Sequence, residues 1–122
     1  MLGQQRAITQ RQGYDRENIE AYTVLAEHAQ SVGERVALLR EAVRIGNRLW
    51  APVLEGSETV DWWRDLGTRP FMRAILAYGQ ALAEMDMPEH AEQCFKALLV
   101  MQPSDSLGAA AELSKPSGPG PR

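Results

Sequence analysis

Two stretches with helical spacing, joined by a short break that ends in a proline, run from Thr68 to Asp105 and constrain the fold most. Pro70 suits the first turn of a helix because its missing N–H would be unpaired there, and the Thr68 hydroxyl is a suitable cap. Apolar or small residues then recur on one helical face: Phe71, Ile75, Tyr78, Gly79 and Leu82. The pattern predicts a helix that ends at the break, residues 84–88.

Pro88 begins the second stretch, for which Asp86 or Met87 is the expected cap, with Asp86 the better chemistry. Its apolar residues again share one face: Ala91, Cys94, Phe95, Leu98, Leu99 and Met101. Pro103 disfavours a helical conformation at Gln102, so the second helix is expected to stop before it. The two stretches together predict an antiparallel helical hairpin.

Small residues mark where these helices would meet. Gly79 and Ala91 allow a close approach, and Phe95 fills the space beside them. With Pro103, these residues resemble a tetratricopeptide repeat, a helix–turn–helix unit of about 34 residues that here begins at Met72. Five positions depart from the pattern: Ile75 replaces Trp, Tyr78 Leu, Leu82 Tyr, Asp86 the turn Gly and Leu98 the second Ala. The alternative is a generic helical hairpin.

The phrase Thr-Arg-Pro-Phe-Met-Arg-Ala, residues 68–74, is similar to a motif of one subgroup of tetratricopeptide-like proteins. In that subgroup a Trp-containing lead-in precedes Thr-Arg-Pro-Tyr-Met-Arg-Ala, and a segment such as Asn-Pro-Asn-Asp-Asn-Gln-Gly closes the repeat. Residues 102–108 match this closing segment in part. The subgroup has no established activity, so the resemblance implies a fold and a binding role only.

An earlier pair of helical stretches, Ile19–Val32 and Val36–Leu49, flanks Gly33. With Gly33 at the turn of a repeat, Leu25 and Ala26 fall at the family's Leu-Gly pair and Ala42 at its aromatic site. We therefore expect a degenerate first repeat over residues 19–50. The turn residues Gly33 and Asp86 are 53 positions apart (86 − 33), which exceeds a repeat of about 34 residues and predicts an insert over residues 51–69.

The insert is expected to hold a loop at Pro52, Gly56 and Ser57, followed by a short helix through Trp62, Trp63 and Leu66 that ends at Gly67. Ser57 or Thr59 is the expected cap of that helix. Trp50, Trp62 and Trp63 are expected to fold over the gap between the hairpins; the alternative is an exposed aromatic anchor for a partner.

Shorter segments are expected on either side of the two hairpins. Residues 1–12 fit the end of a preceding second helix, so that the chain would begin within a repeat, and Gly13–Asn18 fits a turn with Asp15 or Asn18 as the next cap. After Pro103, a short helix is expected within residues 104–113, capped by Ser104 or Asp105. Residues 114–122 are rich in Pro, Gly and Ser and are expected to be disordered. The predicted domain is residues 1–113.

Composition narrows the class of protein. The 122 residues are 44% hydrophobic, enough for the core of one small domain, and the formal charge of −3 argues against nucleic acid as a partner. No segment has the length of a membrane span, and the N-terminus lacks an apolar signal core. The single cysteine, Cys94, lies on an apolar face and is expected to be a buried thiol. These features predict a cytoplasmic protein.

The sequence shows no catalytic or metal-binding constellation. His28 and His90 lie on polar faces of separate hairpins without a motif around either, and Asp86 with His90 gives two ligands on one face but no third. We therefore expect no enzyme activity, no metal and no cofactor.

Arginines are the remaining candidates for binding. Arg40, Arg44 and Arg48 recur every four residues and are interpreted as a solvated face, with an anion-binding stripe as the alternative. Arg69 and Arg73 are expected to brace the insert through Asp61 or Asp65, with direct partner contact as the alternative.

The resemblance to tetratricopeptide proteins implies a groove formed by the first helix of each repeat. The matching positions are Glu20, Thr23, Glu27, Gln30, Arg73, Leu76, Gln80 and Glu84. The carboxylate clamp of chaperone-binding members is absent, because Thr23, Glu27 and Ala77 stand at its positions. We expect an all-α scaffold or adaptor that binds a peptide or helix. The alternatives are a homo-oligomerising module and a non-catalytic subunit of an enzyme.

Overall fold

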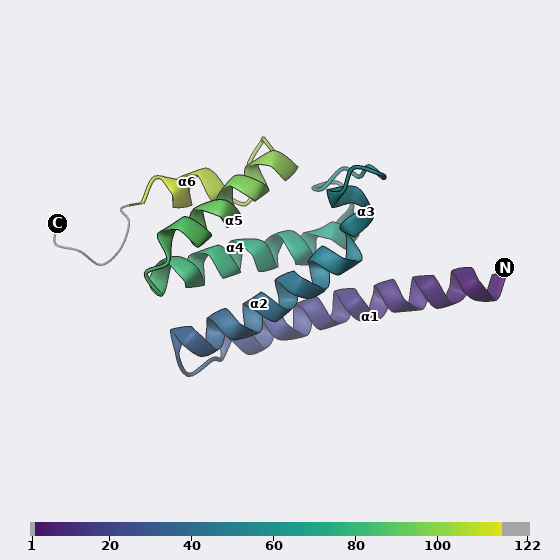
Figure 1. Cartoon of the computed structure of the whole chain (residues 1–122), viewed down its shortest axis with the longest axis horizontal. Coiled ribbons are helices and arrows are strands. Elements are labelled where there is room, and N and C mark those ends of the chain that lie inside the picture. Colours follow the sequence, from purple (N-terminus) through teal and green to yellow (C-terminus); the bar gives the residue numbers. More distant parts are fainter. Residues whose placement is uncertain (1, 116–122) are drawn as a thin grey trace.

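The computed structural model describes the backbone of residues 2–115 and the side chains of residues 13–115, and its regular elements are all helical, as predicted. Four helices form two antiparallel hairpins, α1 (Leu2–Glu27) with α2 (Val32–Leu49) and α4 (Arg69–Glu84) with α5 (Pro88–Met101). Figure 1 shows α2 and α5 nearer the viewer than α1 and α4. The two hairpins therefore stand side by side in two layers.

Helix α1 is one continuous helix, which contradicts the predicted boundary between residues 12 and 19. The turn expected at Gly13–Asn18 is helical, and residues 2–12 belong to the same helix rather than to a preceding one. The predicted cap Asp15 is instead a buried side chain within α1, and its carboxylate lies 3.3 Å from Nη2 of Arg48 on α2. This cross-helix ion pair holds the segment in register against α2.

The first hairpin turns at residues 28–31, not at Gly33, which lies inside α2. Ser31 caps α2, because its Oγ accepts from the backbone N–H of Glu34 at 3.1 Å, and the Glu34 carboxylate accepts from the N–H of Gln30 at 3.1 Å. A serine followed three residues later by Glu is a capping-box pattern, and here it outweighs the glycine. The repeat alignment built on Gly33 is therefore wrong. That alignment placed Leu25 at the Leu of the family's Leu-Gly pair, but the Leu25 side chain is 54% exposed.

Close packing of α2 on α4 joins the two hairpins. A Cβ built on Gly46 would lie 2.1 Å from Cδ1 of Phe71, so the phenyl ring occupies the space that any larger residue would need. A second apolar cluster, made of Ile19, Ala42, Ile45 and Ala74, connects α1, α2 and α4. Three helices thus share one core.

The second hairpin has the bounds and the packing that the sequence predicts. A Cβ on Gly79 would lie 2.6 Å from Cε1 of Phe95 and 3.0 Å from Cβ of Cys94, so α4 and α5 approach closely at this glycine. Helix α5 ends at Met101, before Pro103. Asp86 takes a left-handed conformation with φ of 59°, which fits its place at the turn glycine of the repeat pattern.

The predicted caps of this hairpin are right in position but not in chemistry. Thr68 and Met87 do occupy the N-cap positions of α4 and α5, but neither makes a side-chain cap. Asp86, the preferred cap, instead terminates α4: the N–H groups of Asp86 and Met87 donate to the carbonyls of Ala83 and Leu82. The buried Thr68 hydroxyl donates to the Asp65 carbonyl at 2.7 Å and so fixes the end of the insert.

The insert agrees with the prediction in part: Gly56 and Ser57 lie in the predicted loop and Leu66 is helical, but Pro52 is helical and two tryptophans of the predicted helix are not. Pro52 lies in the first turn of α3 (Ala51–Leu54), and Trp62 and Trp63 lie in a turn before the 3-10 helix η1 (Leu66–Thr68). Proline is favourable in the first turn of a helix, so Pro52 begins α3 instead of forming a loop.

The predicted caps were Ser57 and Thr59, but Asp61 and Asp65 cap the segment. Asp61 accepts from the N–H groups of Trp63 at 3.2 Å and Arg64 at 3.0 Å, and Asp65 accepts from the N–H of Gly67 at 2.9 Å.

The tryptophans cover the junction of the hairpins, as expected. The Trp50 and Trp62 rings meet edge to face with centroids 6.0 Å apart, and Trp62 lies 6.2 Å from Phe71. All three tryptophans are half-buried against the main core, which favours the structural interpretation over an exposed anchor.

A short helix, α6 (Ala109–Leu113), packs beside α5. It begins later than predicted, but Asp105 contributes to its start, because its carboxylate accepts from the N–H groups of Ala109 at 2.6 Å and Ala110 at 3.0 Å. The predicted disordered tail lies outside the described residues from residue 116 onward. No helix in the described part is long and apolar enough to cross a membrane.

Candidate functional site

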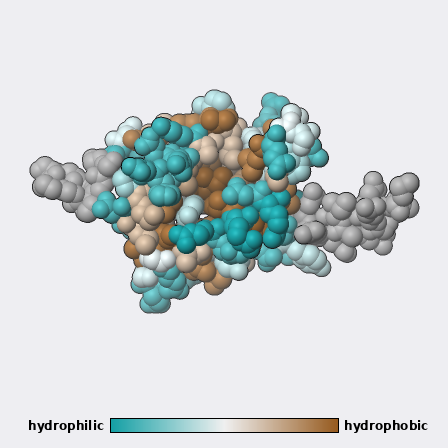
Figure 2. All heavy atoms as spheres, in the orientation of Figure 1, coloured by the Kyte–Doolittle hydropathy of each residue, from teal (hydrophilic) through white to brown (hydrophobic). Residues whose placement is uncertain are grey.

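An apolar cleft lies between α2, α4 and α5, with a volume of about 340 Å³. Its floor is the face of α4 that carries Phe71, Ile75, Tyr78 and Leu82. One wall is α2 with the adjoining α3, and the other is α5; their lining residues are Val43, Asn47, Leu54, His90, Gln93, Cys94, Ala97 and Met101. Figure 2 shows brown apolar atoms in the middle of this face, between teal polar margins.

The polar groups at the cleft are neutral or basic. Asn47, His90 and Gln93 are the polar lining residues on α2 and α5, and no carboxylate belongs to the lining in the described part of the chain. Arg40 on α2 places its Nε 3.4 Å from the Tyr78 hydroxyl, at the edge of the floor. The cleft therefore combines an apolar floor with a margin that suits an acidic group on a ligand.

Cys94 lines the cleft as a protonated thiol, which is a poor nucleophile. The side chain is half-buried, and this burial raises the pKa of the thiol from its ordinary 9.0 to about 11. Because the thiolate is the reactive form, the group is almost entirely unreactive thiol at neutral pH. The sequence prediction of a structural cysteine agrees with this environment.

We expect the labelling rate of Cys94 by a maleimide to keep rising with pH toward about 11. The folded-state pKa lies above the ordinary value, so the stability from the buried thiol is present below pH 9.0 and is lost as the pH rises to about 11. As a control, Val100→Cys in a Cys94→Ser background places a thiol at an 82% exposed position, where labelling should level off near the ordinary pKa. A plateau near 9.0 for Cys94 itself would contradict this environment.

The predicted groove residues of α4 lie on the opposite face of that helix from the cleft. At about 100° per residue, Arg73, Leu76, Gln80 and Glu84 point roughly 180° away from the cleft floor. Leu76 packs partly against the core, Gln80 donates to Glu112 of α6 at 3.2 Å, and Glu84 forms an ion pair with Arg35 of α2. The fourth side chain, Arg73, is exposed and forms no hydrogen bond or ion pair with another described residue.

The other predicted groove residues lie on α1 and in the turn that follows it. The Thr23 hydroxyl donates to the Ile19 carbonyl of its own helix at 2.8 Å, and Gln30 lies in the hairpin turn. Glu20 and Glu27 are exposed on α1. The groove therefore stays a prediction, and the hollow that sequence reasoning missed lies on the other side of α4.

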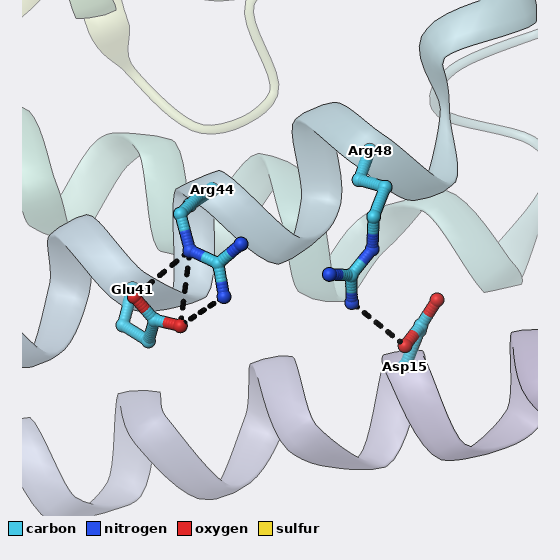
Figure 3. Close-up of polar contacts among 4 residues, drawn as sticks. All are labelled: Asp15, Glu41, Arg44 and Arg48. Atoms are coloured by element: carbon cyan, nitrogen blue, oxygen red, sulfur yellow. Dashed lines mark hydrogen bonds and ion pairs between the residues drawn. The ribbon is translucent and has the colours of Figure 1, made fainter.

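The arginine row of α2 is engaged mainly in ion pairs within the chain (Figure 3). Arg44 folds back on Glu41, donating from Nε at 3.0 Å, and this hydrogen bond holds the pKa of Glu41 below its ordinary value. Arg48 reaches across to Asp15 of α1. The solvated-face interpretation agrees with these contacts, and only Arg40 is directed to the cleft.

Arg69 braces the insert, but through a carbonyl and a ring instead of a carboxylate. Its Nε donates to the Trp63 carbonyl at 2.8 Å, and its guanidinium lies 4.1 Å from the centre of the Trp63 ring. Asp61, one of the two predicted partners, instead places its Oδ2 4.0 Å from Nε of Arg64. The Arg73 side chain is exposed.

His28 and His90 are both exposed, as expected. Among the described residues, no group of three or more His, Cys, Asp or Glu side chains is placed to hold a metal ion.

Comparison with protein-family models, with curated proteins and with solved structures finds no match for this chain.

Proposed function

We propose that this chain is a tetratricopeptide-like adaptor that binds an amphipathic helix of a partner protein in the apolar cleft. The cleft carries the proposal: it is a hollow of about 340 Å³ over an apolar face of one helix, where Tyr78 is half-buried and its apolar neighbours are buried, with walls on two others. Its volume lies at the lower end of the roughly 300–1,000 Å³ typical of ligand sites. A few apolar side chains from one face of a helix suit such a space better than a large compact ligand.

The margins of the cleft favour a partner with carboxylates. Arg40 on α2 lies at the edge of the floor, His90 on α5 is part of the lining, and carboxylates are absent from the described lining. An acidic flank on the bound helix would pair with Arg40 without meeting a like charge. The partner class is therefore an amphipathic helix with an apolar stripe and Asp or Glu beside it.

The predicted adaptor function is retained, but its site moves from the α1–α4 face to the α2–α4–α5 face. The proposed tetratricopeptide-like character is supported by the second hairpin, where Gly79 lies close to Phe95 and Asp86 takes a left-handed conformation at the turn. The cytoplasmic location stays a prediction from the sequence.

A matched pair of variants tests the site. Ala97 is exposed on the cleft wall and Ala83 is exposed on α4 near Leu76, so Ala97→Arg and Ala83→Arg make the same change on opposite faces. We expect immobilised wild type and Ala83→Arg to retain the same protein from a native lysate, and Ala97→Arg to lose it. Loss with Ala83→Arg and retention with Ala97→Arg would return the site to the predicted groove.

A further inference from the structure

The apolar cleft has two ends that can be told apart. Helices α4 and α5 are antiparallel, so His90 of α5 lies toward the end of the floor that carries Leu82. Met101 lies toward the opposite end, where the floor carries Phe71. The floor extends over eleven residues of α4 (82 − 71), a rise of about 16 Å or three helical turns.

The Leu82 end of the cleft offers hydrogen-bond donors. Arg40 of α2 donates from Nε to the Tyr78 hydroxyl at 3.4 Å, one turn of α4 before Leu82. The other N–H groups of this guanidinium make no hydrogen bond to a described residue, so they can donate to a ligand. His90 and Gln93 add polar side chains to the lining of this half from α5.

The opposite end is apolar and is bordered by carboxylates. Its apolar lining residues are Leu54, Phe71, Ala97 and Met101. Asn47 of α2 contributes an uncharged amide. Glu55 directly follows Leu54, and both Glu55 and Glu58 are exposed after α3. A carboxylate of a ligand would therefore lie near like charges at this end and near Arg40 at the other.

We infer that the partner helix lies along α4 in one orientation, with its carboxylates at the Leu82 end beside Arg40 and with apolar side chains at the Phe71 end. This assignment rests on the proposed adaptor function and adds the arrangement of residues that the partner must have. Because the floor spans about three turns, the stripe holds three or four apolar side chains in an i, i+4, i+7 pattern. Asp or Glu lies just beyond one end of that stripe.

The three tryptophans of the chain report on this orientation, because all of them lie at the Phe71 end. The ring centroid of Trp62 is 6.2 Å from that of Phe71, and the centroid of Trp50 is 6.0 Å from that of Trp62. Trp63 lies against Arg69, at the start of α4. A nitroxide on a bound peptide quenches tryptophan fluorescence only at short range, so the quenching shows which end of the peptide lies near Phe71.

Two synthetic helical peptides test the orientation with the full chain. Both have leucines in an i, i+4, i+7 and i+11 pattern among Ala and Gln; one carries Glu-Glu after this stripe, and the other has the same residues in reverse order. We expect both peptides to bind. In each, a nitroxide at the apolar end should quench the tryptophan fluorescence more strongly than a nitroxide at the acidic end.

The outcomes separate the orientation from the adaptor function. Equal quenching from the two ends, or stronger quenching from the acidic end, would overturn the orientation and leave the adaptor proposal intact. Ala97→Arg should abolish binding of both peptides, whereas Ala83→Arg should retain it. Failure of both peptides to bind wild type, or binding that survives Ala97→Arg, would refute the cleft as the adaptor site and the orientation with it.

Arg40→Gln tests the contact at the acidic end. We expect this change to weaken binding of the Glu-Glu peptide about three- to fivefold at low salt, the range of a favourable exposed ion pair. A peptide with Gln-Gln in place of Glu-Glu should bind wild type and Arg40→Gln equally. The same loss for both peptides would show that Arg40 does not pair with the acidic end.

Discussion

Phe71→Ala should destabilise the fold by about 3–5 kcal/mol, the cost of truncating a fully buried aromatic ring. The ring is 1% exposed, fills the space above Gly46 and contacts Trp62, so its loss opens a cavity at the junction of the two hairpins. A domain has a total stability of about 5–15 kcal/mol, so this change removes a large part of it. Urea unfolding followed by circular dichroism measures the effect.

Leu66→Ala is the matched control for this truncation. Leu66 also belongs to the connection between the hairpins, but it is 69% exposed, and its truncation should change the free energy of unfolding by less than about 0.5 kcal/mol. Equal effects at the two positions would show that the hairpins do not join through Phe71.

Gly46→Ala should destabilise the protein even though alanine is the better helix former. Its Cβ would lie 2.1 Å from Cδ1 of Phe71, a contact that forces α2 and α4 apart or displaces the ring. Overpacking of this kind costs about 1–3 kcal/mol, which exceeds the gain of ~1 kcal/mol in helix propensity. Thermal unfolding of the variant should therefore begin at a lower temperature than that of wild type.

Gly33→Ala, in the same helix, should instead raise the free energy of unfolding. The nearest atom to a Cβ at Gly33 is Oγ of Ser31 at 3.9 Å, an ordinary contact, so only the propensity gain of up to ~1 kcal/mol remains. A Gly46→Ala variant as stable as Gly33→Ala would contradict the close approach of α2 and α4.

The second hairpin was predictable because its signals are local and agree with one another. Proline at the start of each helix, the small residues Gly79 and Ala91, and Pro103 after the end all limit the backbone directly. The first hairpin carries conflicting signals. Gly33 favours a turn at its own position, whereas the hydrogen bonds of Ser31 and Glu34 fix the start of α2 before it.

Long-range contacts explain the other errors. Nothing near Gly13 in sequence shows that Asp15 will pair with Arg48, yet this contact accompanies the continuous helix through the predicted turn. The cleft likewise depends on how α2 packs on α4, and these helices approach closely where Gly46 meets Phe71, 25 residues away in the sequence (71 − 46). The apolar stripes predicted that most of the lining residues belong to the core, but they did not indicate that a hollow would remain between α2 and α5.

The measurement that tests the adaptor proposal most directly uses Cys94, the single cysteine of the chain, which lines the cleft. The rate of thiol labelling is measured with and without a saturating amount of the partner captured by the wild-type chain. The exposed control thiol of Val100→Cys in a Cys94→Ser background shows whether the reagent remains available. We predict that the bound partner protects Cys94 at least about tenfold while the control thiol stays reactive. An unchanged Cys94 rate in the complex would contradict binding in the cleft.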